Sequence, residues 1–574
     1  MADGYARLTH KPQAVIVHVD VGTQGLGAAV HNASAGRAPV LVFAGISPIT
    51  QDGELRGSRT EFIHWIQDVP DQKQIVAQYC RYAAELKTGV NVKQMVNRAL
   101  QFARSAPTGP VYLCGSREVM EMEIEPYEIR QADWEPVELG GLPSAAVRKI
   151  AEALAGAEEP LLITGYGGRD HAVPGRLVEL ADTVRGLRVM DTGGSDMCFP
   201  ADHPGWLGLR YGIEEAIRTA DVIVVLDCDV PWISTQCRPR EDARIFHIDV
   251  DPLKQVMPLF YIQAQHRYRA DALTSVEQVL ALLKSGEGFK AQLAGEARDK
   301  KWAALQESYK KRLEAIAVRS QPLENGDFGT SHLCAKLKDL CPQDTLWAIE
   351  AVTNTFFVHD SLQPTIPGSW INCGGGGLGW SGGGALGMKL ASEYEAQQRG
   401  EKGKFVVQIV GDGTFLFSVP GSVYWISRRY NIPVLTIVLN NKGTWKNSLP
   451  LNSFDSGLTL PQAGTPPASP CCWSTPTASA PTRPMRISTS RSTPSLTTLA
   501  SRRPPPEVIS LPPVSTRRPT WRGCSRRPSR PSKGGRRPSW TAKSRWAARC
   551  PAEMSVYNAG VLVKCRRRCI KSKC

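Results

Sequence analysis

The sequence predicts an α/β protein in which three doubly wound parallel sheets are followed by a disordered, basic tail. Two observations indicate the sheets: short apolar runs are bounded by turn residues, and segments with helical spacing lie between these runs. Parallel strands require such crossover connections. A third observation indicates the tail, because Pro, Ser, Thr and Arg dominate residues 461–550 and no period of two or 3.6 is sustained there.

The first domain is predicted over residues 1–118. Two apolar runs flank a segment rich in Gly and Ala, which is the pattern of a strand, a crossover helix and a parallel strand. A segment with helical spacing then leads through two prolines to a short final strand. In chain order these segments are 14–19, 22–36, 40–44, 92–105 and 111–114.

The second domain is predicted over residues 143–285, after an acidic linker at 119–142 that contains two prolines. Helical segments alternate with strands, which indicates a Rossmann-like sheet. Gly165–Gly168 (GYGG) follows the first strand and could contact a nucleotide, but the absence of a full GxGxxG pattern favours a plain tight turn. The four predicted strands are 160–165, 188–191, 221–227 and 244–251.

A charged helical linker is predicted over residues 286–324 and a third α/β domain over 325–449, and the disordered tail then occupies 450–574. The third domain has an apolar strand, a long Gly-rich turn, a second strand, a helix near Tyr424 and a third strand. The strands are predicted at 345–351, 404–410 and 432–441.

Charge and cysteine also divide the chain near residue 450. The formal charge is +15, but residues 451–574 hold 23 basic and 3 acidic residues (+20), which leaves 46 basic and 51 acidic residues (−5) for 1–450. A tail of this kind would bind nucleic acid only without specificity. The cysteines of the body are typical of reduced thiols in an intracellular protein. No apolar stretch reaches the roughly 18 residues of a membrane span, so we expect a cytoplasmic protein, although the sequence is silent on organelle targeting.

The strongest functional signal is a GDG triplet at the end of an apolar strand, with two asparagines 26 residues later at the end of the next strand. Mg²⁺ requires fixed oxygen ligands, which Asp412, Asn441 and the carbonyl of Gly443 could supply together with a diphosphate. Gly411 and Gly413 allow the backbone to approach phosphate, and the following helix directs its N-terminus toward negative charge. The motif therefore predicts a magnesium diphosphate site.

With this spacing, residues 1–449 resemble the thiamine-diphosphate-dependent enzymes that include acetolactate synthase, benzoylformate decarboxylase and pyruvate decarboxylase. The resemblance implies a pyrimidine-binding, a central Rossmann-like and a diphosphate-binding domain, of which the first and third are incomplete. It also implies that the ligands named above hold Mg²⁺. Gly413 and Thr414 would then contact the diphosphate, together with an earlier loop that runs from Glu350 to Thr353.

The run CGGGGLG at residues 373–379 resembles the segment of this family that lies against the aminopyrimidine ring. Leu378 would wedge between the two rings of the cofactor and force a V shape. The carbonyl of Gly376 would accept a hydrogen bond from the exocyclic amine and favour its reactive tautomer. Without the resemblance, four consecutive glycines would indicate only a flexible loop.

The segment MADGYAR at the start resembles a part of the family's pyrimidine-binding domain that follows the activating glutamate. No residue precedes Met1 in this sequence, so we expect the glutamate to be absent from the chain. General acid–base transfer of this kind typically contributes about a hundredfold or more to the rate. A shifted reading frame or a mis-spliced exon would explain the abrupt change near residue 450, and we expect the activity of this chain to be impaired.

The resemblance implies an acetolactate synthase-like carboligase or decarboxylase, a lyase or transferase that acts on 2-oxo acids, and the segment 246–252 (FHIDVDP) resembles acetolactate synthase in particular. It also implies a homodimer or homotetramer, because each cofactor lies between two subunits. Some relatives bind FAD or ADP in the central domain. The alternatives are a simple 2-oxo-acid decarboxylase, a hydroxyacyl-coenzyme A lyase, or an inactive pseudoenzyme or faulty gene model.

Overall fold

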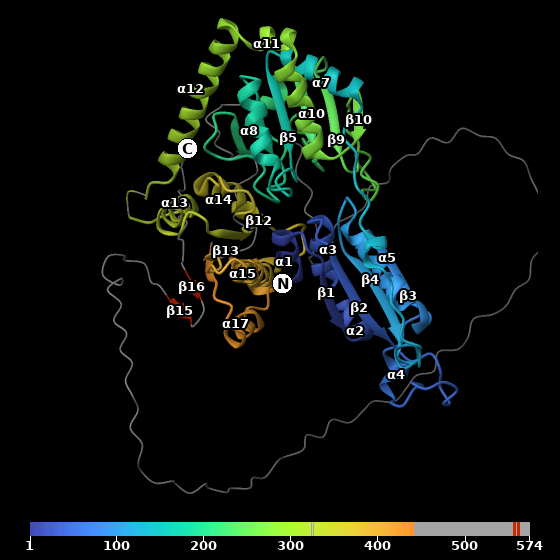
Figure 1. Ribbon diagram of the computed structural model, residues 1–574. Coiled ribbons are helices and arrows are strands. Elements are labelled where there is room, and N and C mark those ends of the chain that lie inside the picture. Colours follow the sequence, from blue (N-terminus) through green and yellow to red (C-terminus); the bar gives the residue numbers. More distant parts are fainter. Residues whose placement is uncertain (323, 325, 441–554, 558–559, 563–574) are drawn as a thin grey trace, which may run out of the picture. The chain divides into compact units, whose positions relative to one another are not determined.

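The computed structural model of the chain describes residues 1–322, 324, 326–440, 555–557 and 560–562. Three parallel sheets follow one another along the chain, and helices connect most of their strands (Figure 1). The prediction of three parallel-sheet α/β domains is therefore confirmed. The predicted ligands Asn441 and Gly443 and most of the predicted tail lie outside the described residues.

The first domain contains a sheet of four parallel strands. Its elements are α1 (Ala2–Thr9), β1 (Gln13–Val17), α2 (Val19–Gln24), α3 (Gly27–Ala35), β2 (Val40–Ile46), α4 (Ile63–Ile66), β3 (Tyr82–Leu86), α5 (Val92–Arg104), β4 (Val111–Ser116) and α6 (Arg117–Met120). The strand order is β1-β2-β4-β3. The predicted crossover between the first two strands is confirmed, but it consists of two helices. Strand β3 adds to the prediction, and it lies at the edge of the sheet with mostly half-buried residues.

The central domain contains a sheet of six parallel strands. Its elements are α7 (Ser144–Gly156), β5 (Pro160–Thr164), α8 (Val173–Thr183), β6 (Arg188–Asp191), β7 (Trp206–Leu209), α9 (Glu215–Thr219), β8 (Val222–Leu226), β9 (Arg244–Asp249), β10 (His266–Arg269) and α10 (Ala272–Ser285). The order is β10-β9-β8-β5-β6-β7. The four predicted strands are confirmed, and β7 and β10 are added at the two edges. Apolar side chains cover both faces, with Ile150 and Leu177 on one side and Met190 and Ile223 on the other.

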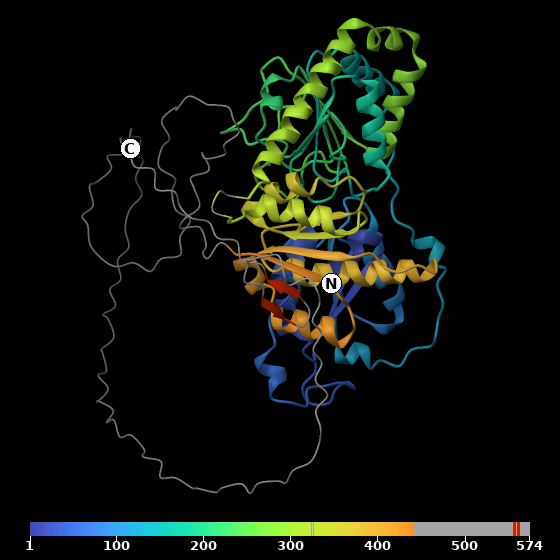
Figure 2. The ribbon, with the colours of Figure 1, turned by 90° about the vertical axis from the view of Figure 1, so that its left-hand side faces the viewer.

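The predicted charged linker forms helices α11 (Glu287–Leu293) and α12 (Glu296–Arg319). Helix α12 runs along the central domain in both views (Figures 1 and 2). The Tyr309 hydroxyl donates to the carbonyl of Ala201 at 2.9 Å, and Arg312 donates to the carbonyl of Leu207 at 3.1 Å. The linker is therefore part of the packed structure of the central domain.

The third domain contains a sheet with the strand order β12-β11-β13-β14, again with all strands parallel. Its elements are α13 (Thr330–Leu340), β11 (Leu346–Glu350), η5 (Val352–Asn354), α14 (Thr355–Leu362), β12 (Trp370–Asn372), α15 (Trp380–Gln398), β13 (Val406–Gly411), α16 (Asp412–Phe417), α17 (Pro420–Arg429) and β14 (Leu435–Leu439). All three predicted strands are present.

The predicted long Gly-rich turn is wrong in part, because the glycines after Gly379 belong to helix α15. Glycine is unfavourable inside a helix by about 1 kcal/mol relative to alanine, which is why the pattern suggested a turn. Here the glycines allow α1 to pack directly on α15. A Cβ added to Gly4 would overlap the carbonyl oxygen of Gly384, and one added to Gly387 would overlap that of Met1. Close helix packing therefore decides the residue type at these positions.

Two short strands, β15 (Ser555–Tyr557) and β16 (Gly560–Leu562), pair antiparallel within the segment predicted as the tail. The rest of that segment lies outside the described residues. Within the ranges that the structure describes, every helix is too short or too polar to cross a lipid bilayer.

Candidate active site

The residues predicted to contact a cofactor follow the carboxyl ends of adjacent strands in the third sheet. Glu350, the last residue of β11, is in register with Val410 of β13, and Gly411 of β13 is in register with Leu439 of β14. The strands therefore end at a common level. Open α/β sheets bind their ligands outside the carboxyl ends of the strands. The structure brings the described members of the predicted set to this edge: Thr353, Gly376, Leu378, Gly411, Asp412, Gly413 and Thr414.

The GDG triplet forms the junction between β13 and α16. Gly411 caps the helix in an extended conformation, and Asp412 is its first residue. Asp412 is half-buried, and its Oδ1 accepts the N–H of Gly413 at 2.9 Å. The space beside Gly411 is open, because a Cβ there would meet only the hydroxyl of Thr414, at 3.9 Å. The backbone of this junction is accessible to a ligand.

Of the three predicted metal ligands, the structure describes Asp412. Asn440 follows β14 and marks the end of the strand next to Asp412, while Asn441 and Gly443 come after the last described residue of this segment. Among the described residues, no group of three or more His, Cys, Asp or Glu side chains is arranged to hold a metal ion.

The loop between β12 and α15 presents the second predicted motif. Gly376 is exposed, and a Cβ on it would meet no other atom within 4 Å. Leu378 is 40% exposed, which is high for an apolar side chain between two buried elements. Both residues can therefore contact a ligand at this edge.

Helix α3 of the first domain holds this loop through Asn32, a residue that the sequence reasoning missed. Asn32 is buried, its Oδ1 accepts the N–H of Gly375 at 2.9 Å, and its Nδ2 donates to the carbonyl of Gly377. The N–H of Gly376 donates to Nε2 of His31 at 3.1 Å. The adjacent His-Asn pair in the Gly- and Ala-rich segment was the only signal in the sequence.

Glu350 fixes the other end of the loop, at the start of α15. The sequence reasoning missed this role, as it missed that of Asn32. Its fully buried carboxylate accepts the N–H groups of Gly379 at 2.9 Å, Trp380 at 3.1 Å and Ser381 at 2.7 Å. These donors belong to the start of α15, where a negative charge is favourable. Burial raises the pKa of Glu350 above its ordinary value, although the three N–H groups oppose this effect. Thr353, three residues later, is exposed in η5.

Comparison with protein families matches part of each of the three domains. The model described as "Thiamine pyrophosphate enzyme, N-terminal TPP binding domain" matches residues 1–75. The models for the central domain and the C-terminal TPP binding domain of the same enzymes match residues 147–257 and 351–446. The chain belongs to the thiamine pyrophosphate enzyme family. The resemblance inferred from the two motifs is thereby confirmed.

Relatives of this thiamine pyrophosphate enzyme carry the names of several reactions. A probable acetolactate synthase large subunit from Methanocaldococcus jannaschii is 23% identical over 470 residues, which cover 77% of this chain and 71% of the relative. Benzoylformate decarboxylase from Pseudomonas aeruginosa is 23% identical over 463 residues, with coverages of 78% and 77%. 2-Hydroxyacyl-CoA lyase 1 from Mus musculus is 23% identical over 457 residues, with coverages of 78% and 72%.

The fold of this enzyme also matches a solved structure. The crystal structure of benzoylformate decarboxylase from Polynucleobacter necessarius superposes with a TM-score of 0.60 at 20% identity, covering 77% of this chain and 76% of that chain. The likeness confirms the three-domain α/β fold.

The donor set at the carboxyl edge of the third sheet fits thiamine diphosphate. Asp412 offers a carboxylate to a hard cation, and the open backbone at Gly411 can approach a diphosphate. At Gly376 the backbone is equally open, and Leu378 presents an apolar surface to a ring system. The described residues thus offer both a polar and an apolar contact region for one extended cofactor.

Proposed function

We propose that this thiamine pyrophosphate enzyme acts on 2-oxo acids as an acetolactate synthase-like carboligase or decarboxylase. The observation that carries the proposal is the convergence of Asp412, the open backbone of Gly376 and the exposed side chain of Leu378 at one edge of a parallel sheet. Two of the relatives named above, the acetolactate synthase and the benzoylformate decarboxylase, support this class of reaction.

In this proposal the cofactor is held by the residues predicted from the motifs. Asp412, Asn441 and the carbonyl of Gly443 would coordinate Mg²⁺, and the metal would neutralise the diphosphate. Gly413 and Thr414 would contact the diphosphate together with Thr353. Asp412 suits this role, since it lies at a strand end and its carboxylate is held by the N–H of the adjacent Gly413.

When bound, thiamine diphosphate supplies an electron sink for the electron pair released when a 2-oxo acid loses carbon dioxide. The chain's own residues position the cofactor for that chemistry. Leu378 would support the angle between its two rings, and the Gly376 carbonyl would accept a hydrogen bond from the pyrimidine amine. Glu350 and Asn32 hold the backbone of this loop at its two ends, so these contacts are made by a fixed surface.

We also propose that the enzyme works as a homodimer or homotetramer. Helices α16 and α17 and their connection leave large apolar side chains more than half exposed, namely Leu416, Phe417, Val419 and Trp425. Several large exposed apolar side chains in one region are typical of subunit interfaces. Light scattering on the purified full chain tests the proposal, and a mass equal to one chain at micromolar concentration contradicts it.

The proposed cofactor site is tested first by binding. We would titrate thiamine diphosphate with Mg²⁺ into the full chain and follow the heat of binding, for the wild type and for Asp412→Ala. Loss of the charged ligand should weaken binding by about a hundredfold or more. Asp344→Ala is the matched control, because Asp344 is an exposed acid of the same domain. Equal affinities for the wild type and Asp412→Ala would refute the metal site.

The reaction is then tested with the loaded protein. Pyruvate and benzoylformate are supplied separately, and both carbon dioxide release and carbon–carbon bond formation are measured. Acetolactate from pyruvate supports a synthase, whereas carbon dioxide with an aldehyde product supports a simple decarboxylase. Turnover of a 2-hydroxyacyl-CoA with neither 2-oxo acid consumed would replace the proposal with a lyase.

A further inference from the structure

The central sheet has its own carboxyl edge, with a topological switch point between β5 and β8. From β5 the chain proceeds outward to β6 and β7 on one side and later to β8, β9 and β10 on the other. Doubly wound sheets bind nucleotides in the crevice at this point. The GYGG turn follows β5 here, and Asp227 follows β8. This is the place where an FAD or ADP would be expected.

The two loops that border the switch point are bonded to each other. The N–H groups of Gly165 and Tyr166 both donate to the carbonyl of Asp227, at 3.2 and 2.8 Å. In nucleotide sites the backbone N–H groups of such a turn face the phosphates instead. Two backbone N–H groups of the GYGG turn are therefore bonded to the loop after β8 and are not available to a ligand in the crevice.

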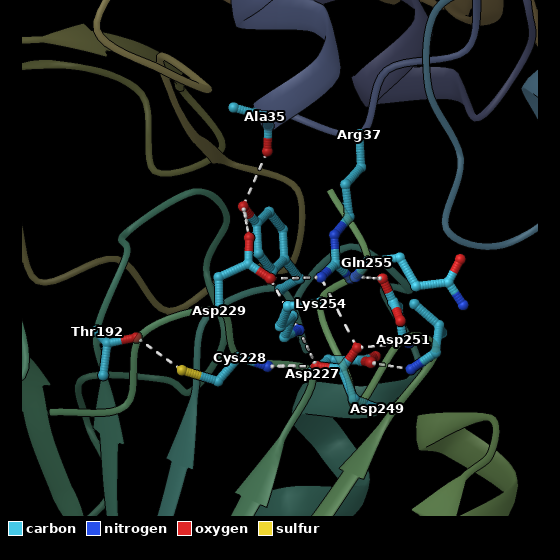
Figure 3. Close-up of polar contacts among 12 residues, drawn as sticks. Ala35, Arg37, Thr192, Asp227, Cys228, Asp229, Asp249, Asp251, Lys254 and Gln255 are labelled. Carbon is cyan, nitrogen blue, oxygen red and sulfur yellow. Dashed lines mark hydrogen bonds and ion pairs between the residues drawn. The ribbon is translucent and has the colours of Figure 1, made fainter. Parts of the chain in front are cut away.

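A side chain from the first domain fills the space above these loops. Arg37 points into the group formed by Asp229, Asp249 and Lys254 (Figure 3). Its Nη2 lies 2.9 Å from Oδ1 of Asp229 and 3.9 Å from Oδ1 of Asp249. The guanidinium also lies 3.9 Å from the centre of the Tyr166 ring, a cation–π contact.

A second buried cation belongs to the same group. Nζ of Lys254 lies 2.6 Å from Oδ2 of Asp249 and 2.8 Å from Oδ1 of Asp229. Burial alone would raise the pKa values of Asp229 and Asp249, but Arg37 and Lys254 hold both below their ordinary value, whereas burial and the nearby Asp249 raise the pKa of the third acid, Asp227, to about 7. Asp229 and Asp249 are thus ionised and paired, and an incoming diphosphate would have to break these pairs and then face the carboxylates.

The central domain also holds the backbone at the end of α3. The Tyr166 hydroxyl lies 2.8 Å from the carbonyl oxygen of Ala35. Arg169 donates to the carbonyl of Gly36 at 2.8 Å and to that of Arg37 at 3.1 Å. The last carbonyls of a helix have no partner within the helix, and here Arg169 of the central domain donates to that of Gly36. The Tyr166 hydroxyl has one proton for the Ala35 carbonyl and for Oδ2 of Asp229 at 2.9 Å. The Arg37 carbonyl also accepts the Thr108 hydroxyl of the first domain at 2.6 Å.

We infer that the carboxyl edge of the central sheet is a socket for Arg37 of the first domain and takes the place of a nucleotide site. The socket fixes the C-terminal end of α3, one turn beyond His31 and Asn32, which contact the loop at Gly375–Gly377. Arg37 is therefore a positioning residue for that loop. The socket itself does not depend on the proposed reaction, because it is defined by contacts between the first and central domains.

Hydrogen exchange on the full chain tests the socket. In Arg37→Ala, peptides covering 27–36 and 374–379 should exchange about tenfold faster or more, since the fixed end of α3 is released. Arg37→Lys keeps the charge and should restore part of the protection. Arg56→Ala is the control, because Arg56 is a 69% exposed arginine of the same domain that pairs with Glu121 and Glu123 on the surface. Unchanged exchange in folded Arg37→Ala would overturn the inference.

Asp229→Asn provides a second route if Arg37→Ala does not fold, since it removes one carboxylate and leaves the guanidinium in place. It should raise exchange in the same two peptides. FAD and ADP are then titrated separately into the wild type by calorimetry, and we expect no saturable binding up to about millimolar concentration. Stoichiometric binding of either nucleotide, with protection of residues 165–168 and 227–229, would overturn the socket whatever the outcome of the thiamine diphosphate titration.

Discussion

The carboxylate of Glu350 accepts the backbone N–H of Ser381 at 2.7 Å, although the two residues lie on different sides of the Gly-rich loop. The end of β11 and the start of α15 are therefore joined by a hydrogen bond, which fixes one end of the loop between β12 and α15. No Lys, Arg or His among the described residues forms an ion pair with this buried acid, and the N-terminus of α15 supplies the compensating partial charge.

Replacing this acid should destabilise the fold. Glu350→Gln keeps one acceptor oxygen but removes the charge and turns an amide N–H₂ toward N–H donors. We expect the free energy of unfolding to fall by about 1–3 kcal/mol, measured by urea denaturation. Glu401→Gln, an exposed acid after α15, should change it by less than about 0.5 kcal/mol. Equal midpoints for Glu350→Gln and the wild type would contradict the capping role.

Leu378 should matter for the cofactor and not for the fold. Because its side chain is 40% exposed, Leu378→Ala should leave the unfolding free energy within about 0.5 kcal/mol of the wild type. Loss of its contact area should weaken thiamine diphosphate binding by about tenfold. The control is Leu390→Ala on α15, which removes a side chain of the same type that is 36% exposed. Titration calorimetry decides the matter, and the idea fails if both variants bind alike.

The contact between α1 and α15 should reverse the usual effect of alanine in a helix. Gly4→Ala would place a Cβ against the carbonyl of Gly384, and this overpacking should destabilise by about 1–3 kcal/mol. Gly175→Ala in α8 faces open space and should stabilise by about 0.5–1 kcal/mol. Thermal unfolding of the two variants would show shifts of opposite sign. Shifts of the same sign would argue against close packing of the two helices.

His359 should make stability depend on pH. Its ring is buried between Trp206 and Trp370, and burial lowers its pKa to about 4. As the pH falls from about 6.5 toward 4, the unfolded chain binds a proton that the folded chain does not, so the wild type loses stability. His359→Phe removes this effect. Over this pH interval the unfolding free energy of the wild type should fall by about 3 kcal/mol relative to that of His359→Phe. If the difference in unfolding free energy between the wild type and His359→Phe does not change with pH, burial does not keep the His359 ring neutral.

The strands that the sequence did not predict share one property. Strands β3, β7, β10 and β12 all lie at the edges of their sheets. Strands β3 and β10 are only partly buried, so their residues need not form a continuous apolar run, whereas β7 and β12 are buried but have only four and three residues. The burial along β10, which alternates between half-buried and exposed, illustrates this. The central strands are buried on both faces, and their apolar runs identified them directly.

The residues of the candidate site also divide into those whose roles the sequence reasoning named and those whose roles it missed. Asp412 and Leu378 belong to local motifs whose chemistry can be read from neighbouring residues, so the sequence alone led to their proposed roles, which stay predictions. Asn32 and Glu350 act through residues that are 343 and 31 positions away in the chain. Their roles depend on how the domains and strands pack, and a pattern of neighbouring residues does not contain that information. Arg37 was missed for the same reason.

The clamp on α3 has a consequence for the order of events during synthesis. Arg169, which donates to the carbonyl of Gly36, is made 133 residues after it. At about 5–20 residues per second the ribosome needs roughly 7–27 s to add that stretch. Throughout this delay the carbonyl of Gly36 lacks this donor. The nascent first domain therefore waits for the central domain before this end of the helix reaches its final state.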